Sequence, residues 1–342
     1  MNQSMNPPLQ CSYAAISSPP SNTLQSGEMR KSMSMSVEEY CHLPLIDLHH
    51  LRSDDEKERF ACRSAISRAS SDWGFFQVVN HGISTELLKN MPREQGKLFQ
   101  TPFERKATNG LLNNSYRWGS PTATSPTQFS WSESFHIPLS QISQQPCFTG
   151  FTSLREVMMD FSASMSKLAK LLAGVLAENL GHSTAVFEDK CHESNSFLRL
   201  NHYPPCPISS EVFGLVPHTD SDFLTILYQD EVGGLQLMKD SKWVAVEPNQ
   251  DALIVNIGDL FQAWSNDVYK SVEHKVMANR TKERYSIAYF LCPSYDTLIG
   301  SCKESSIYRD FTFGEFRKQV QEDVKKTGHK VGLPRFLLQN TC

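Results

Sequence analysis

The 342-residue chain has no apolar run approaching the roughly 18 residues that a membrane-spanning helix needs. It also has no cluster of basic residues, and its formal net charge is −4. Neither feature is typical of a nucleic-acid-binding protein. We therefore expect no membrane partner and no nucleic-acid partner. No sustained apolar stripe suited to pairing two copies is present, which predicts a monomer.

Cysteine pairs at zinc-ligand spacing are missing as well. The nine cysteines are scattered, odd in number and never arranged as Cys-x-x-Cys. This pattern argues against a zinc ribbon and against a disulfide framework. It predicts reduced thiols in an intracellular compartment, namely the cytoplasm, with the nucleus as the alternative.

The first 42 residues have little hydrophobic periodicity and are rich in Ser, Met, Pro, Asn and Gln. Residues 1–42 are therefore expected to form a mobile tail. A transit peptide is the alternative reading. Arg30 and Lys31 are the only arginine or lysine residues before Arg52, which argues against that alternative.

Residues 43–190 are predicted to form an N-terminal region of helices, short strands and substrate loops. Apolar residues at helical spacing, and Ser84 as a candidate N-cap, indicate the helices. The elements expected are helices at 54–70, 84–100 and 151–180 and short strands at 42–47 and 73–82. The polar stretch 110–130 is predicted to be a long connection, a kind of segment that often carries binding residues.

Residues 195–295 change to short strand-like runs with turn signals between them, a pattern typical of a sandwich or barrel. The strands expected are 197–203, 215–218, 224–229, 234–238, 243–246, 252–257, 271–277 and 284–291. Eight strands suit a double-stranded β-helix, the jelly-roll fold. The chain is thus predicted to be an α+β protein with a jelly-roll core flanked by helices and a mixed N-terminal region. Residues 296–342 are expected to form a C-terminal helical segment.

A candidate metal site lies within the predicted core. His218 and Asp220 are two residues apart, so in a strand their side chains point to the same face. His274 follows well downstream. Two histidines and one carboxylate form the facial triad of non-haem Fe(II) oxygenases. A zinc hydrolase site is an alternative that uses the same ligand types.

A second motif follows the downstream histidine. The turn-like run 279–282 lies between two predicted strands and suggests a β-hairpin, which would place His274 opposite Ser286 or Ile287. Arg284 and Ser286 again share one face. Because a guanidinium binds a carboxylate bidentately, this pair suits the far carboxylate of a dicarboxylate cosubstrate. A zinc hydrolase would leave the pair without a role.

With these motifs, the chain resembles the plant 2-oxoglutarate- and Fe(II)-dependent dioxygenases over residues 43–338. Further family motifs are Asn-His-Tyr-Pro-Pro-Cys at 201–206 and the aromatic run at 73–82. The resemblance implies that His218, Asp220 and His274 bind Fe(II). It also implies that Arg284, with Ser286, binds 2-oxoglutarate. Tyr203 and Asn201 are implied as further cosubstrate contacts. O₂ is implied as the other cosubstrate and ascorbate as a stimulant.

Within that family the chain is most similar to gibberellin 2-beta-dioxygenases of the subgroup that acts on C20 gibberellins. The similarity lies in residues 116–119, 131–133, 218–237, 256–266 and 320–326. It implies 2β-hydroxylation of a gibberellin, which inactivates the hormone. Alternatives are oxidation of another small molecule, such as a flavonoid or another gibberellin position, and a jelly roll that binds a small molecule without turnover.

The implied substrate is a rigid diterpenoid acid, which calls for an apolar pocket with one cationic or donor group. Arg199 shares a strand face with Asn201 and is one candidate for that group. Arg117, in the long connection, is the other. Tyr116 and Trp131 lie in aromatic segments beside polar residues and are the candidate apolar contacts.

Overall fold

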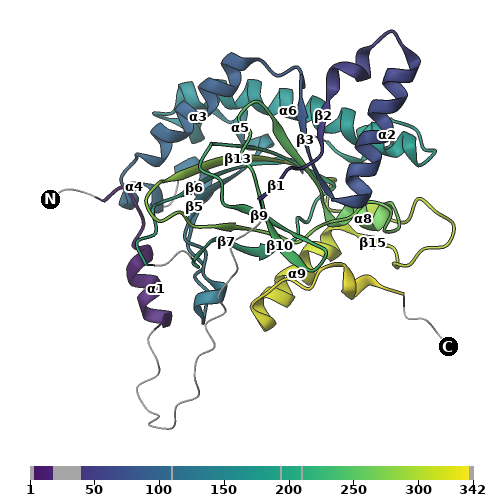
Figure 1. Cartoon of the computed structure of the whole chain (residues 1–342). Helices are drawn as coiled ribbons and strands as arrows, with labels where there is room; N and C mark the ends of the chain where they lie inside the picture. The colour runs from purple at the N-terminus through teal and green to yellow at the C-terminus, as the bar shows by residue number, and fades with distance from the viewer. Residues whose placement is uncertain (1–3, 18–39, 109–110, 193–194, 209–210, 339–342) are drawn as a thin grey trace.

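The computed structural model describes residues 4–17, 40–108, 111–192, 195–208 and 211–338. Two β-sheets face each other, and helices cover the outside of the larger one. In Figure 1 these helices, α2 (Glu56–Asp72), α3 (Thr85–Phe99) and α6 (Thr152–Asn179), lie along the upper side of the strands. This architecture confirms the predicted α+β jelly roll.

The larger sheet has eight strands. In spatial order they are β2 (Leu45–Asp47), β3 (Phe75–Val79), β11 (Leu253–Ile257), β8 (Leu224–Gln229), β13 (Arg284–Leu291), β6 (Phe197–Tyr203), β5 (Glu133–Pro138) and β4 (Tyr116–Trp118). Strands β2 and β3 run parallel, and the other neighbours are antiparallel. The predicted bounds of β6, β8 and β13 are correct to the residue.

The smaller sheet has five strands. In spatial order they are β1 (Tyr40–Cys41), β10 (Lys242–Val246), β9 (Leu235–Lys239), β12 (His274–Met277) and β7 (Phe213–His218). Its inner side chains, Leu235, Leu237 and Val276, pack against Phe75 and Tyr203 of the larger sheet. This apolar contact joins the two sheets.

The predicted hairpin between the strands of His274 and Arg284 is wrong. Strand β12 pairs with β7 and β9 in the smaller sheet, whereas β13 lies between β6 and β8 in the larger one. The run 279–282 therefore crosses from one sheet to the other. The Asn279 side chain stabilises this corner by accepting hydrogen bonds from the N–H groups of Thr281 and Lys282. Such a corner has the same residue preferences as a hairpin turn.

Helix α6 supplies the main core on the outer face of the larger sheet. Met158, Phe161, Met165, Leu168 and Leu172 are buried at helical spacing. They belong to the same core cluster as the outward-facing side chains of β8 and β13. The inner side chains of those strands therefore point the other way, into the space between the sheets.

The remaining helices have local sequence causes. Helix α3 begins where Ser84 accepts a hydrogen bond from the N–H of Leu87, as predicted. Helix α9 (Phe313–Thr327) has a capping box between Thr312 and Glu315 and ends at Gly328 with φ 78°. The shorter helices are α4 (Phe103–Ala107), α5 (Leu139–Ile142), α7 (Val186–Lys190) and α8 (Asp259–Trp264), and a small sheet pairs β14 (Leu298–Ile299) with β15 (Phe311–Thr312). None of the described helices combines the length and apolarity that crossing a bilayer requires.

The expected mobile tail over residues 1–42 needs correction. Residues 9–17 form helix α1 (Leu9–Ser17), and Leu9 is buried in a cluster with Phe129 and Trp131. The ring of Tyr13 contacts the same two aromatic side chains. These apolar residues give the helix a docking face. Residues 18–39 lie outside the described residues.

Candidate active site

A cavity lies between the two sheets, lined by side chains from both of them. Every second residue of β13 lines it, from Arg284 through Ser286 and Ala288 to Phe290. On neighbouring β6 the lining residues are also alternate ones: Arg199, Asn201 and Tyr203. The two-residue period of the strands thus places the polar side chains of Arg284, Ser286 and Asn201 on the inner face, while the alternate residues of these strands face the other side.

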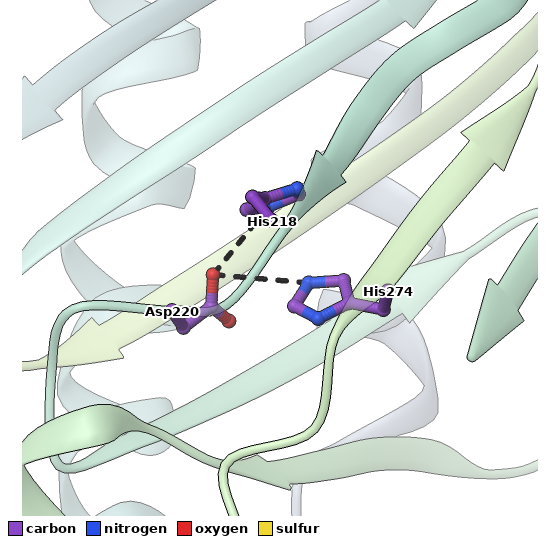
Figure 2. A group of neighbouring side chains, drawn as sticks. All are labelled: His218, Asp220 and His274. Carbon is purple, nitrogen blue, oxygen red and sulfur yellow. Dashed lines mark ion pairs between the residues drawn. The ribbon is translucent and has the colours of Figure 1, made fainter. Parts of the chain in front are cut away.

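Three metal-ligand side chains converge in this cavity (Figure 2). His218 ends β7, Asp220 lies in the loop that follows, and His274 begins β12. The Oδ1 atom of Asp220 is 3.6 Å from Nε2 of His218 and 3.8 Å from Nε2 of His274. Their ligand atoms all lie within 4.8 Å of one another, as one metal ion requires. The structure thus brings together the three residues that the sequence predicts as ligands.

Each imidazole is oriented by the backbone carbonyl of the residue two positions before it. Nδ1 of His218 lies 2.9 Å from the carbonyl oxygen of Val216, and Nδ1 of His274 lies 3.1 Å from that of Val272. Because a carbonyl oxygen can only accept, Nδ1 carries the proton in both rings. The lone pair is therefore on Nε2, which faces Asp220. This is the tautomer that a metal-binding histidine uses.

The carboxylate of Asp220 is held from its other side. Its Oδ2 atom accepts hydrogen bonds from Thr225 Oγ1 at 2.6 Å and from Asn256 Nδ2 at 2.9 Å. Burial favours the neutral acid, but the two nearby imidazoles and these hydrogen bonds outweigh it and lower the pKa of Asp220 to about 2. Burial and the neighbouring ring of His274 lower the pKa of His218 to about 3. The site therefore presents a carboxylate and a neutral imidazole at neutral pH.

A buried cation lies on the other side of the cavity. Arg284 is 2% exposed, and its Nη2 donates to Oε1 of Gln229 at 2.6 Å. Its Nε and Nη1 atoms are buried without a partner among the described residues. Unpaired buried guanidinium groups are costly, so this one is suited to an anionic ligand with two oxygens.

The neighbours of Arg284 complete a polar cradle. The β13–β6 register pairs Arg284 with Tyr203, whose ring lies 4.9 Å below the guanidinium, and pairs Ser286 with Asn201. Nδ2 of Asn201 is 3.3 Å from Oγ of Ser286. Behind the strands, the buried amide of Gln95 on α3 donates to the backbone carbonyls of both Asn201 and Ser286. The donor set fits a dicarboxylate that reaches from this cradle to a metal held by the three ligands.

Comparison with known proteins agrees with this geometry. Residues 194–293 match the 2OG-Fe(II) oxygenase superfamily, and residues 43–153 match the family described as non-haem dioxygenase in morphine synthesis N-terminal. The chain is 60% identical over 302 residues to gibberellin 2-beta-dioxygenase 6 of Oryza sativa subsp. japonica, covering 86% of this chain and 84% of that protein. The chain belongs to the 2OG-Fe(II) oxygenase superfamily.

Two further similarities support the assignment of the chain to this oxygenase superfamily. It is 56% identical over 303 residues to gibberellin 2-beta-dioxygenase 8 of Arabidopsis thaliana, covering 88% of this chain and 89% of that protein. The crystal structure of JOX2 in complex with 2OG, Fe and JA matches with a TM-score of 0.77 at 30% identity, covering 98% of this chain and 100% of that chain. The oxygenase is an Fe(II)- and 2-oxoglutarate-dependent enzyme with a small-molecule substrate. The alternatives of a zinc hydrolase and of a non-catalytic binding protein are therefore set aside.

The predicted substrate contacts lie in different places. Arg199 lines the cavity of the oxygenase, as expected from its strand face. Arg117 lies outside this cavity, in a neighbouring pocket. Tyr116 and Trp131 need correction, because neither is among the residues that line the cavity. Tyr116 is buried and donates its hydroxyl to Glu133, while Trp131 packs under α1.

Sequence reasoning missed four supporting residues: Gln95, Thr225, Gln229 and Asn256. Asn256 carried a local signal, because it is the only polar residue in the otherwise apolar strand β11. An amide in a fully buried strand needs a hydrogen-bond partner, and here that partner is Asp220. Gln229 carried no such signal, because it is one of two polar residues in β8 and lies at the strand end.

Proposed function

We propose that this oxygenase 2β-hydroxylates gibberellins, with C20 gibberellins as its preferred substrates, and thereby inactivates the hormone. The support for the reaction is the guanidinium of Arg284, whose Nε and Nη1 atoms have no partner among the described residues and which lines the cavity that holds three metal-ligand side chains. The support for the substrate is the 60% and 56% identity to two gibberellin 2-beta-dioxygenases over most of the chain.

In this proposal, Nε2 of His218, Oδ1 of Asp220 and Nε2 of His274 bind Fe(II). Arg284 pairs with the far carboxylate of 2-oxoglutarate. The other contacts to that cosubstrate are Ser286, Tyr203 and Asn201. When bound, Fe(II) and 2-oxoglutarate supply the activation of O₂, so that a C–H bond of the substrate becomes C–OH while 2-oxoglutarate becomes succinate and CO₂.

The residues of the chain orient these groups. Val216 and Val272 keep the histidine protons on Nδ1, so both Nε2 lone pairs face one point. Thr225 and Asn256 hold Oδ2 of Asp220, which leaves Oδ1 free for the metal. Gln229 orients Arg284 through Nη2 and leaves Nε and Nη1 for the cosubstrate. Leu215, Leu227 and Phe290 give the cavity apolar walls, which suit a diterpenoid skeleton and exclude water.

The test is product analysis by mass spectrometry. Purified oxygenase with Fe(II), ascorbate and 2-oxoglutarate is incubated with a panel of C20 and C19 gibberellins. We expect C20 substrates to gain one oxygen atom with release of one succinate each, and ascorbate to stimulate turnover. Oxidation of C19 gibberellins alone would support the proposed reaction but contradict the proposed preference for C20 substrates. Consumption of 2-oxoglutarate with no gibberellin oxidised would overturn the hormone assignment.

The same proposal includes a monomeric enzyme located in the cytoplasm or nucleus. Each cysteine in the described part of the chain is a free thiol, which supports a reducing compartment. Sedimentation of the purified protein and a fluorescent fusion in plant cells test these two points directly.

A further inference from the structure

A second pocket borders the cavity on the same face of the larger sheet. Arg199 lines both spaces. The register of β5 on β6 pairs His136 with Arg199 and Ser134 with Asn201, and both β5 residues line the second pocket. The inner face of the sheet therefore continues without interruption from the candidate cosubstrate cradle into this pocket.

Three guanidinium groups from three separate elements line the second pocket. Arg117 comes from β4, Arg199 from β6 and Arg317 from α9, and His136 lies among them. The rest of the described lining consists of amide, hydroxyl and proline side chains, with no acidic residue. We call the four residues Arg117, Arg199, Arg317 and His136 the arginine pocket.

The positive charge of the arginine pocket is not balanced within the described residues. Nη1 of Arg117 donates to two backbone carbonyls, and the guanidinium of Arg317 lies 5.9 Å from the ring centre of Phe313. Nε of Arg199 is buried without a partner. The ion pairs that arginines form in the described chain involve other positions. Burial and the positive charges of the three guanidinium groups lower the pKa of His136 to about 4. All three guanidinium groups therefore act electrostatically on this one imidazole.

We propose that the arginine pocket binds a carboxylate of the acidic substrate and thereby presents the rest of the molecule to the iron side of the cavity. This assignment rests on the proposed function, because gibberellins are rigid polycyclic acids. Guanidinium groups hold carboxylates in a fixed, bidentate geometry. The site is separate from the cradle of Arg284, which serves the cosubstrate. The two carboxylic acids of one reaction thus have two different cationic sites.

Arg317 is the residue to test, because it belongs to the arginine pocket but does not line the iron cavity. Dissociation constants are measured by equilibrium dialysis with a radiolabelled C20 gibberellin and its methyl ester. The protein is loaded with Fe(II) and 2-oxoglutarate without oxygen, so no turnover occurs. We expect Arg317→Gln to weaken binding of the acid about tenfold, the effect of losing a charge-assisted hydrogen bond, and to leave binding of the ester unchanged.

Lys318→Gln is the matched control, because it removes one positive charge from the exposed neighbour on the same helix. It should bind the acid like the wild type. The KM for 2-oxoglutarate should be unchanged in Arg317→Gln, and Arg317→Lys should recover part of the affinity. If Arg317→Gln fails to fold, Arg117→Gln, at the exposed position of strand β4, takes its place.

Two failures are distinguishable. If the wild-type oxygenase binds and oxidises the gibberellin but Arg317→Gln and Arg117→Gln bind the acid equally well, the arginine pocket is not the carboxylate site. If the acid and its ester bind the wild type equally well, the site is also overturned. If the wild type neither binds nor oxidises any gibberellin, the proposed function fails and this assignment falls with it.

Discussion

His274 lies directly opposite His218 in the β12–β7 pair, and the centres of their rings are 4.3 Å apart. Each ring is anchored to the carbonyl of the residue two positions before it in its own chain segment. The backbone register of two adjacent antiparallel strands fixes the relative position of these two ligands, so no loop has to close to bring them together. The geometry for metal binding is therefore built into the sheet, and Asp220 needs only a short loop to join it.

Asn256 should tune the affinity for iron. Replacing it by leucine removes one of the two hydrogen bonds to Oδ2 of Asp220 and leaves the carboxylate less well oriented. Loss of such a supporting contact costs roughly 10- to 100-fold in metal affinity. Anaerobic Fe(II) titration of Asn256→Leu measures it, with Gln250→Leu near the exposed start of the same strand as control. Equal affinities in the two variants would show that Asn256 does not orient Asp220.

Arg284→Lys should weaken binding of 2-oxoglutarate without affecting iron. A lysine keeps the charge but cannot form two parallel hydrogen bonds. Truncating a buried charged pair costs about 2–5 kcal/mol, so KM for 2-oxoglutarate should rise roughly 30-fold or more. Steady-state kinetics at saturating Fe(II) check this. Arg280→Lys, in the exposed corner between β12 and β13, is the control. A wild-type KM in Arg284→Lys would place the carboxylate of 2-oxoglutarate elsewhere.

Helix α1 should contribute to stability. Leu9 is 2% exposed in its cluster with Phe129 and Trp131, so Leu9→Ala leaves a cavity under the helix. Leucine-to-alanine changes at buried sites cost about 2–5 kcal/mol, and the lower end applies here because the cluster is small. Urea denaturation gives the difference, with the exposed Gln10→Ala as reference. Identical unfolding midpoints would mean that α1 does not dock in solution.

His136 should make stability depend on pH. Its pKa is lowered from 6.5 to about 4 by burial and by Arg199, Arg317 and Arg117. The unfolded chain therefore binds more protons than the folded one between these values. The contribution of His136 to the free energy of unfolding is fully present above pH 6.5 and is lost as the pH falls towards 4. The upper limit of this loss is about 3 kcal/mol.

Urea unfolding of the wild type and of His136→Gln between pH 7 and pH 4.5 tests this. The variant should lose less stability than the wild type over that window. His192→Gln, which replaces an exposed histidine, should behave like the wild type. Parallel pH profiles for all three proteins would contradict the expectation.

The strands of the core could be predicted from the sequence because their inner and outer residues alternate in chemistry. In β13, Arg284 and Ser286 face the cavity while Ile287 and Leu291 face the helices, and the run of eight residues shows this directly. The pairing of the strands could not be predicted so well. A turn at 279–282 has the same local sequence whether it returns within one sheet or crosses to the other.

Other features depend on contacts far apart in the chain. Arg317 reaches the pocket of Arg199 only because α9 packs back beside the sheet, and no pattern near residue 317 indicates this. Helix α1 is short, and its role depends on Phe129 and Trp131, more than a hundred residues away. The sequence predicted Tyr116 as a substrate contact, but on strand β4 its hydroxyl donates to the buried side chain of Glu133 instead.

The position of the new hydroxyl group tests the central claim most directly. The product from a C20 gibberellin is compared by gas chromatography and mass spectrometry with authentic standards hydroxylated at different positions and faces. The account predicts a single product that coincides with the 2β-hydroxylated standard and is absent without 2-oxoglutarate. A product oxidised at C20 or at another ring position would contradict it and place the enzyme in a different branch of its family.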